Sequence, residues 1–277
     1  MKKILPLLCL STAYIFANID AIVSILPQKT FLQAIGGDKI NITLMVQPGN
    51  SPHTYEPKPS QMISISKADI YMTIGVEFEK VWLPKFINLN HKMKVIHLSH
   101  DIEKIPMVHT HHEESKSLDP HIWTSPSNVK IIAQNIYKAL ITIDKMNMLY
   151  YKNNLNKFLD NVEQTDKKIK KTLATLKDNR SFMVFHPSWG YFAKAYHLEQ
   201  ITVEVEGKNP KPRELVNLIK KAKEKKVKAI FTQPEFSDST AKIIAKELDI
   251  PVVKVTPMNP HWSKNLLNIA KTIAGQN

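Results

Sequence analysis

The sequence of 277 residues contains one cysteine, Cys9, and only seven glycines. A single cysteine cannot form an intramolecular disulfide, and zinc sites built from several thiolates are excluded as well. So few glycines also argue against glycine-rich phosphate-binding loops and long flexible linkers. Any transition-metal site in this protein must therefore use nitrogen and oxygen ligands.

After the N-terminal segment the sequence has no long apolar stretch. No later segment approaches the roughly 18 apolar residues that a membrane-spanning helix needs. The N-terminus itself, MKKILPLLCLSTAYIFA, combines two lysines, an apolar stretch and a small residue at Ala17, which is typical of a secretory signal. We expect residues 1–17 to be a cleaved signal peptide, rather than a buried first element of the fold, and the remaining protein to be periplasmic. Cys9 follows Leu7 and Leu8, a poor match to a lipoprotein cleavage site, so we expect no lipid anchor.

Aromatic residues are absent from the most basic runs of the chain, although the formal charge is +13. The lysines of residues 167–171 and 220–228 fall on helical patterns. Binding of nucleic acid would need aromatic side chains interleaved with the basic ones. We therefore interpret these runs as solvated helix faces and expect no nucleic-acid partner.

The first part of the chain alternates between strand and helix patterns. Short apolar, β-branched runs predict strands, and apolar residues at helical spacing predict helices. This alternation indicates a mostly parallel sheet with helices on both faces. The strands are expected at residues 21–26, 40–46, 70–74 and 95–98, and the helices at residues 30–35 and 58–68.

The middle of the chain has no glycine or proline between Pro126 and Leu176, and apolar residues recur there at helical spacing. This pattern predicts one very long helix, or two helices with a break near residues 144–147. Ser125 or Ser127 would cap its start, with Pro126 in the first turn.

The last part of the chain repeats the alternation of the first part. We therefore predict an α/β fold of two mostly parallel-sheet lobes joined by a long helix, with a metal site in the cleft between the lobes. The expected divisions are a signal peptide at 1–17, an N-terminal lobe at 18–126, a linking helix at 127–177 and a C-terminal lobe at 178–277. The expected strands are residues 182–185, 201–205, 229–232 and 252–255, and the expected helices are residues 189–196, 213–225, 237–248 and 262–274.

Three histidines lie in loops or just after strands, each beside a proline and close to an aromatic residue: His53, His121 and His186. Ligands of open α/β sheets bind at the carboxyl ends of the strands, so two sheets that face each other would bring these rings together. Zinc takes imidazole nitrogens in tetrahedral geometry, whereas manganese and magnesium prefer oxygen. The sequence therefore predicts a Zn²⁺ site, with water as the favoured fourth ligand and Glu235 or His261 as the other candidates.

Each ligating ring would need a partner for its second nitrogen, and Asp119 and Glu56 are the expected partners. A second histidine cluster precedes His121 in the sequence. It is either a low-affinity loop that collects metal or a polar surface loop with a chance run of histidines. Its residues are His109, His111, His112, Glu113 and Glu114, and we interpret His91, His97, His100 and His197 as structural or surface residues.

Several segments together resemble the solute-binding proteins of bacterial zinc/manganese ABC transporters, in particular the zinc-uptake type. The segments are VQPGNSPHTYEPKPSQ, DPHIWTSP, FHPSWGYFAKAY and IPVVKVTP. The resemblance implies two α/β lobes joined by one long helix, a metal buried between them and little domain closure. It places the ligands on His53, His121 and His186. A histidine at the third position implies zinc, because manganese-type members usually have a carboxylate there.

The sequence also departs from the family pattern at two positions. Many members carry an aspartate where this chain has Thr256, and some zinc-type members carry a glutamate where it has Pro52. Both departures leave the fourth ligand open. The histidine-rich run before His121 resembles the acidic, histidine-rich loop of zinc-type members.

The resemblance implies a monomeric, high-affinity zinc-binding protein that delivers Zn²⁺ to the permease and ATPase of an importer in the inner membrane, and not an enzyme. A manganese- or iron-binding protein of the same family is one alternative. A secreted zinc hydrolase is another, because three histidines with an open position are also a catalytic arrangement, but no HExxH-type motif occurs. A surface adhesin with incidental metal is the third.

Overall fold

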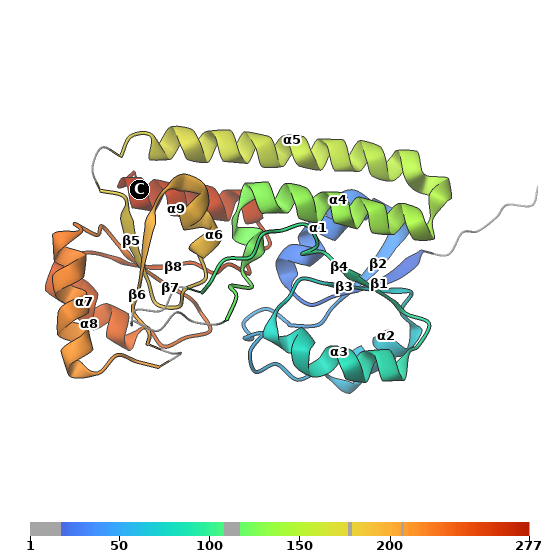
Figure 1. Ribbon diagram of the computed structural model, residues 1–277, viewed down its shortest axis with the longest axis horizontal. Helices are drawn as coiled ribbons and strands as arrows, with labels where there is room; N and C mark the ends of the chain where they lie inside the picture. Colours follow the sequence, from blue (N-terminus) through green and yellow to red (C-terminus); the bar gives the residue numbers. More distant parts are fainter. Residues whose placement is uncertain (1–17, 108–116, 177–178, 206–207, 277) are drawn as a thin grey trace, which may run out of the picture.

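The computed structural model describes residues 18–107, 117–176, 179–205 and 208–276 (Figure 1). The predicted signal peptide therefore lies outside the described residues. Among the helices of the described part, none has the length and apolar character needed to cross a membrane.

The first sheet has four parallel strands in the order β2-β1-β3-β4. Its strands are rich in isoleucine, valine and threonine, which favour extended backbone. All four predicted strands are present. They are β1 (Ile19–Val23), β2 (Ile40–Leu44), β3 (Ile70–Thr73) and β4 (Lys94–His97), accompanied by α1 (Leu26–Gly36), η1 (Gly37–Lys39), α2 (Pro59–Lys67) and α3 (Glu77–Leu89).

The second sheet repeats this arrangement with the order β6-β5-β7-β8, again fully parallel. Parallel strands need crossover connections, and helices provide them here. The strands are β5 (Ser181–Val184), β6 (Glu199–Thr202), β7 (Ile230–Thr232) and β8 (Val252–Lys254), and the helices are α6 (Gly190–Tyr196), α7 (Pro212–Glu224), α8 (Ser239–Leu248) and α9 (Trp262–Ala274). The predicted fold of two parallel-sheet α/β lobes is therefore confirmed.

Two antiparallel helices connect the sheets, α4 (Pro126–Ile143) and α5 (Met148–Leu173), separated by the short 3₁₀ turn η3 (Lys145–Asn147). Of the two alternatives, the one with a break is correct, and a single uninterrupted helix is wrong. Ser125 is the residue before α4, with Pro126 in the first turn, but its hydroxyl bonds the Ser127 hydroxyl instead of capping the backbone. The long helix between the lobes is α5, of 26 residues. The lobe limits given above remain a prediction.

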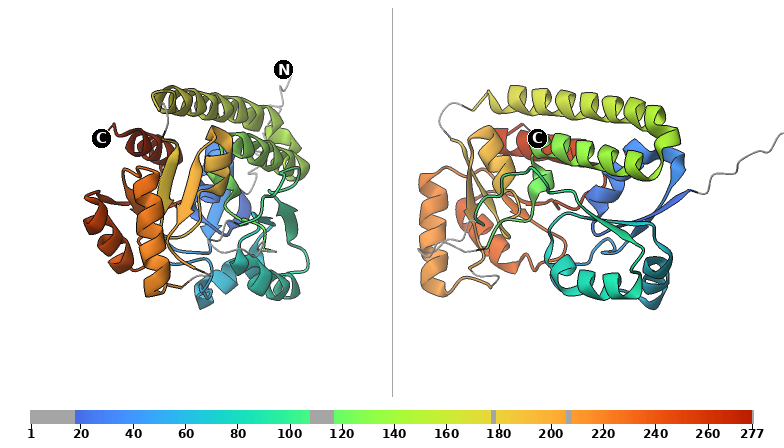
Figure 2. Two further views of the ribbon diagram at one scale, coloured as in Figure 1. Left: turned by 60° about the vertical axis from the view of Figure 1, so that its left-hand side comes forward. Right: turned by 45° about the vertical axis from the view of Figure 1, so that its right-hand side comes forward.

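Apart from α6, the helices of the described residues form three groups around the sheets (Figures 1 and 2). Helices α1, α4, α5 and α9 lie together, and α5 runs along both lobes above α4 and α9. Helices α2 and α3 cover the opposite face of the first sheet, and α7 and α8 lie at the outer side of the second. The chain therefore joins its lobes through a shared helical layer.

One apolar core runs through both lobes. It includes strand residues of both sheets and the inner faces of α4, α5 and α9. A second, smaller core lies only between the C-terminal sheet and α7 and α8. Because buried apolar surface resists separation, the continuous core opposes large movement of one lobe against the other.

Some boundaries differ from those predicted. Helix α1 begins at Leu26 rather than at residue 30, because Pro27 fits the first helical turn, and β1 accordingly ends at Val23. Helix α3 is absent from the predicted elements. Pro84 lies inside it, where a proline normally ends a helix, and this obscures the helical pattern.

Candidate metal centre

The three predicted histidines come from three separate segments that meet between the lobes. His53 lies in the loop after β2, and His186 is the second residue after the end of β5. His121 precedes the short 3₁₀ turn η2 (Ile122–Thr124), which leads into α4. In the second sheet the order of the strands reverses between β5 and β7, and ligands of such sheets bind at the carboxyl ends of the strands beside that point.

The rings lie at the spacing that a shared ion requires. The ring centroids of His53 and His186 are 5.5 Å apart, and those of His121 and His186 are also 5.5 Å apart. Three imidazoles bound to one tetrahedral ion, with metal–nitrogen bonds of about 2.0–2.1 Å, have centroids about 5 Å apart. The positions of the rings therefore fit a common zinc-sized ion.

The orientation of the rings, unlike their spacing, does not yet suit a shared ion. The two neighbouring pairs meet edge to face, at interplanar angles of 80° and 75°. As the side chains stand, no three histidine, cysteine, aspartate or glutamate residues of the described chain are arranged to hold a metal ion. Binding by all three nitrogens would require rotation about side-chain bonds, and the exposed fractions indicate which ring can turn. The His53 side chain is 35% exposed, against 8% for His121 and 9% for His186.

His121 is held by Asp119, the partner expected from the sequence. The carboxylate accepts hydrogen bonds from the backbone N–H of His121 at 2.8 Å and from its ring Nδ1 at 2.7 Å. The ring is thereby fixed with Nε2 available. Gly190 allows this arrangement, because a Cβ atom there would come within 2.6 Å of the Asp119 Oδ2 atom.

His186 is held by Glu204, which the sequence analysis missed. Its ring Nδ1 lies 2.8 Å from Glu204 Oε1, and the ring of Phe236 stacks on it at 5.0 Å. The Nε2 atom of His186 is buried and has no hydrogen-bond partner among the described residues. Burial of an unpaired polar nitrogen is unfavourable, so this atom points to a ligand. Polar residues 200, 202 and 204 alternate along β6 and just beyond it, which marks Glu204 as unusual for a buried segment but does not identify His186 as its partner.

His53 has Glu77 beside it, and not the predicted Glu56. Its Nδ1 lies 3.4 Å from a carboxylate oxygen of Glu77, whereas Glu56 is exposed and has no contact with the three rings. Partial burial lowers the pKa of His53 below its usual value, and the nearby His186 adds to this effect, although Glu77 opposes it. The ring is therefore neutral at pH 7, which is the form that binds a metal.

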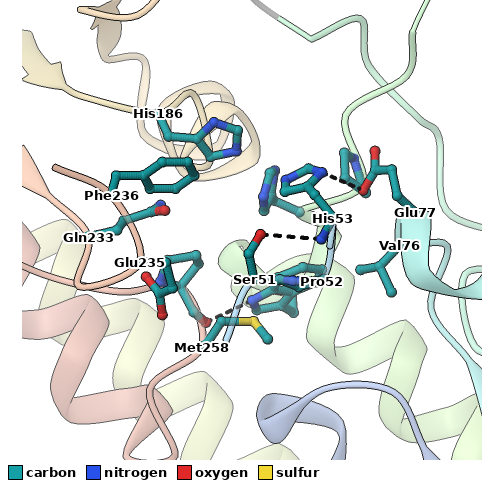
Figure 3. A pocket seen from close by; sticks show the side chains of 14 residues that line it. Ser51, Pro52, His53, Val76, Glu77, His186, Gln233, Glu235, Phe236 and Met258 are labelled. Atoms are coloured by element: carbon teal, nitrogen blue, oxygen red, sulfur yellow. Dashed lines mark hydrogen bonds and ion pairs between the residues drawn. The ribbon is translucent and has the colours of Figure 1, made fainter. Parts of the chain in front are cut away.

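A small cavity of about 30 Å³ lies among these side chains (Figure 3). Of the candidate fourth ligands, Glu235 lines it, and one Glu235 oxygen, Oε2, is buried without a hydrogen-bond partner among the described residues. His261 is exposed just before α9 and does not line the cavity, so its position does not support a role as the fourth ligand. Thr256 does not line the cavity either; its hydroxyl accepts a hydrogen bond from the backbone of Met258.

The histidine-rich cluster cannot be placed. His109, His111, His112, Glu113 and Glu114 lie outside the described residues. The chain on either side of them is joined by an antiparallel bridge between Pro106 and Leu118.

Comparison with known proteins gives a consistent picture. Residues 22–274 match the model of a family described as zinc-uptake complex component A, periplasmic. A manganese ABC transporter substrate-binding lipoprotein of Streptococcus gordonii is 29% identical over 245 residues, which are 85% of this chain and 77% of the relative. A metal ABC transporter substrate-binding lipoprotein of Lactococcus lactis is 30% identical over 230 residues, which are 79% of this chain and 72% of the relative.

Two solved structures show the same fold. A crystal structure of ZnuA is 40% identical, with a TM-score of 0.87, and the match covers 93% of this chain and 98% of that one. A manganese-bound periplasmic metal-binding protein from Candidatus Liberibacter asiaticus, a mutant form, is 22% identical, with a TM-score of 0.81 over 92% of this chain and 98% of that one. At this identity the second likeness concerns the fold alone.

Proposed function

Because this chain belongs to the family of periplasmic zinc-uptake component A proteins, it is a substrate-binding protein of a metal ABC transporter, and we propose that the metal it carries is zinc. It binds a metal ion outside the cytoplasm and is not an enzyme. Proteins of this kind work with a membrane permease and an ATPase. The proposed role is to deliver Zn²⁺ from the periplasm, as a monomer, to such an importer in the inner membrane.

The chemistry of the site supports zinc. Three imidazoles meet at one small cavity, and two of them have a carboxylate hydrogen-bonded to Nδ1, which leaves Nε2 for the metal. Nitrogen donors favour zinc over manganese, which prefers oxygen. The 40% identity to a ZnuA structure supports the same choice. The observation that carries the proposal is the unpaired, buried Nε2 of His186 beside His53 and His121.

Manganese is the second candidate, because the relative from Streptococcus gordonii is named as a manganese transporter protein.

We propose His53, His121 and His186 as ligands and Glu235 as the fourth, with its buried Oε2 turned to the ion. One carboxylate among three imidazoles is a donor set that zinc accepts readily.

Native mass spectrometry with zinc and manganese in competition tests the proposal. We expect one Zn²⁺ per wild-type chain and no Mn²⁺ when both are present at equal concentration. His121→Ala and His186→Ala should each lower the zinc affinity by more than the roughly 10–100-fold that follows the loss of an outer carboxylate. Glu235→Gln should weaken zinc binding, and Glu199→Gln, at the far end of β6, should not. Preferential loading of manganese would replace zinc with the second candidate, and no binding of either metal would refute the proposal.

A further inference from the structure

A buried carboxylate lies at the point of the first sheet where the order of the strands reverses, between β1 and β3. Glu79, in the first turn of α3, is only 5% exposed. It lies in the N-terminal lobe at the position where sheets of this type commonly bind ligands, but here the protein fills that position itself. Among the described residues, its hydrogen bonds are with Ser24, Ile74 and Gly75, none of which is a proposed metal ligand.

The contacts of Glu79 fix the segment between β3 and α3. Its two oxygens accept hydrogen bonds from the backbone N–H of Ile74, at 2.9 and 3.1 Å, and of Gly75, at 2.7 Å. Ser24, which follows β1, donates its hydroxyl to Glu79 Oε1 and also contacts the Tyr71 hydroxyl at 2.8 Å. The carboxylate thus ties the turn to the ends of two central strands.

The same short segment carries the partner of His53. Gly75 has a positive φ of 100°, which a residue with a side chain adopts at a cost, so the chain turns sharply here. Val76 and Glu77 follow it immediately and line the metal cavity. In Figure 3 the Glu77 carboxylate reaches toward the His53 ring, and Glu77 is the only carboxylate in contact with that ring among the described residues.

We propose that Glu79 is a positioning residue for metal binding: it holds the turn at Ile74 and Gly75 so that Glu77 meets and orients His53. This inference rests on the proposed function. His121 and His186 are buried and hydrogen-bonded, so their rings are already fixed. His53 is the ring whose orientation still has to be fixed by its neighbours. By positioning Glu77, Glu79 determines how well the His53 ring is oriented before the metal ion binds.

The charge of Glu79 gives the arrangement a dependence on pH. Burial raises the pKa of Glu79 to about 7, against the lowering effect of its hydrogen bonds from Ser24, Ile74 and Gly75. The titratable groups that face it are the Tyr71 hydroxyl from β3 and the Lys104 ammonium from the segment after β4. Burial keeps the pKa of Tyr71 well above 10, so its hydroxyl stays neutral. Above pH 7 the charged carboxylate accepts strongly from both N–H groups, and below pH 7 its protonated form accepts more weakly.

Zinc affinity of Glu79→Gln, Glu77→Gln and the double variant, measured by chelator competition from pH 6 to 8, tests the inference. Each single variant should bind zinc about tenfold more weakly than wild type at pH 8, as expected for an outer partner of a ligand. In the Glu77→Gln background, Glu79→Gln should add little, because both act through the same ring. The ratio of the Glu79→Gln and wild-type dissociation constants should fall toward one as the pH drops through 7.

The inference is overturned by additive effects of the two substitutions, or by a ratio of dissociation constants that does not change with pH. Both would mean that Glu79 only stabilises the fold. Tyr196→Phe is the control for lost stability, because it removes the hydrogen bond from the Tyr196 hydroxyl on α6 to Asp166 on α5. If the wild-type protein binds no zinc, the proposed function fails first. If it binds zinc and Glu79→Gln equals it at pH 8, this inference alone fails.

Discussion

At the scale of single residues, the separation along the chain decides which partners of the histidines the sequence can predict. Asp119 stands two residues before His121, so its hydrogen bond is a local feature of the turn. Glu204 is 18 residues from His186, and Glu77 is 24 residues from His53. Those pairs form only because parallel strands and a crossover helix bring distant segments to one edge. The three ring positions could therefore be predicted from their prolines and strand ends, but two of the three carboxylates could not.

Glu204→Gln should weaken zinc binding by about 10–100-fold without unfolding the protein. The Glu204 carboxylate fixes the tautomer of His186 and raises the basicity of its free nitrogen, and a neutral amide does this less well. Chelator competition measures the change at a single pH. Glu199→Gln is the matched control, because Glu199 lies at the start of β6, the strand that leads to Glu204, but bonds Ser181 and lysines 221 and 225. An equal loss in both variants would show that the charge of the lobe matters, and not the contact with His186.

At the scale of elements, the sequence leaves the number of helices between the lobes open, and the reason is visible at Asp144. The residues around the break, DKMN, are compatible with a helix, and no glycine or proline marks the turn. Asp144 ends α4 instead by accepting hydrogen bonds from Asn147 and from the Tyr151 hydroxyl, at 2.7 Å. Side chains of this kind compete with the helical backbone, but only the packing of α5 against α4 selects the turn.

Asp144→Ala should lower the free energy of unfolding by about 1–2 kcal/mol, the usual cost of losing a capping side chain. Partial burial raises the pKa of Asp144, but the hydrogen bonds from Tyr151 and Asn147 outweigh it and hold this pKa below 3.8. A carboxyl whose pKa is lower in the folded state stabilises the fold above its unfolded pKa and loses this effect as the pH falls. The difference from wild type should therefore be constant above about pH 4 and shrink below it. Urea unfolding across this range measures it.

Asp160→Ala is the control for this experiment, because Asp160 is exposed on α5. It should leave stability unchanged within about 0.5 kcal/mol. A loss in Asp144→Ala that persists unchanged at pH 2 would show that the hydrogen bonds to the carboxylate are not its cause.

At the scale of the whole molecule, the contacts that join the lobes do not depend on a metal. The indole of Trp262, on α9, donates to the backbone oxygen of Trp123 at 2.7 Å, and the Trp123 indole donates to the oxygen of Pro257 at 2.8 Å. The Trp262 ring also packs edge to face on Phe31 of α1 at 5.8 Å. These buried contacts tie Trp123, two residues after His121, both to the last helix and to the loop after β8. They continue the core shared by the two sheets.

Zinc should therefore bind with little change in the shape of the protein. A binding protein with a flexible hinge contracts when its lobes close on a ligand, whereas this core would have to be opened for such a movement. Small-angle X-ray scattering of the metal-free and zinc-loaded protein should give the same radius of gyration. Trp262→Phe leaves the oxygen of Trp123 without its donor, at a cost of about 1–3 kcal/mol, and should make the radius depend on zinc. Because Phe retains the ring that packs on Phe31, the variant tests the hydrogen bond rather than the core. A clear contraction of the wild-type protein with zinc would mean that the metal, and not the shared core, fixes the lobes.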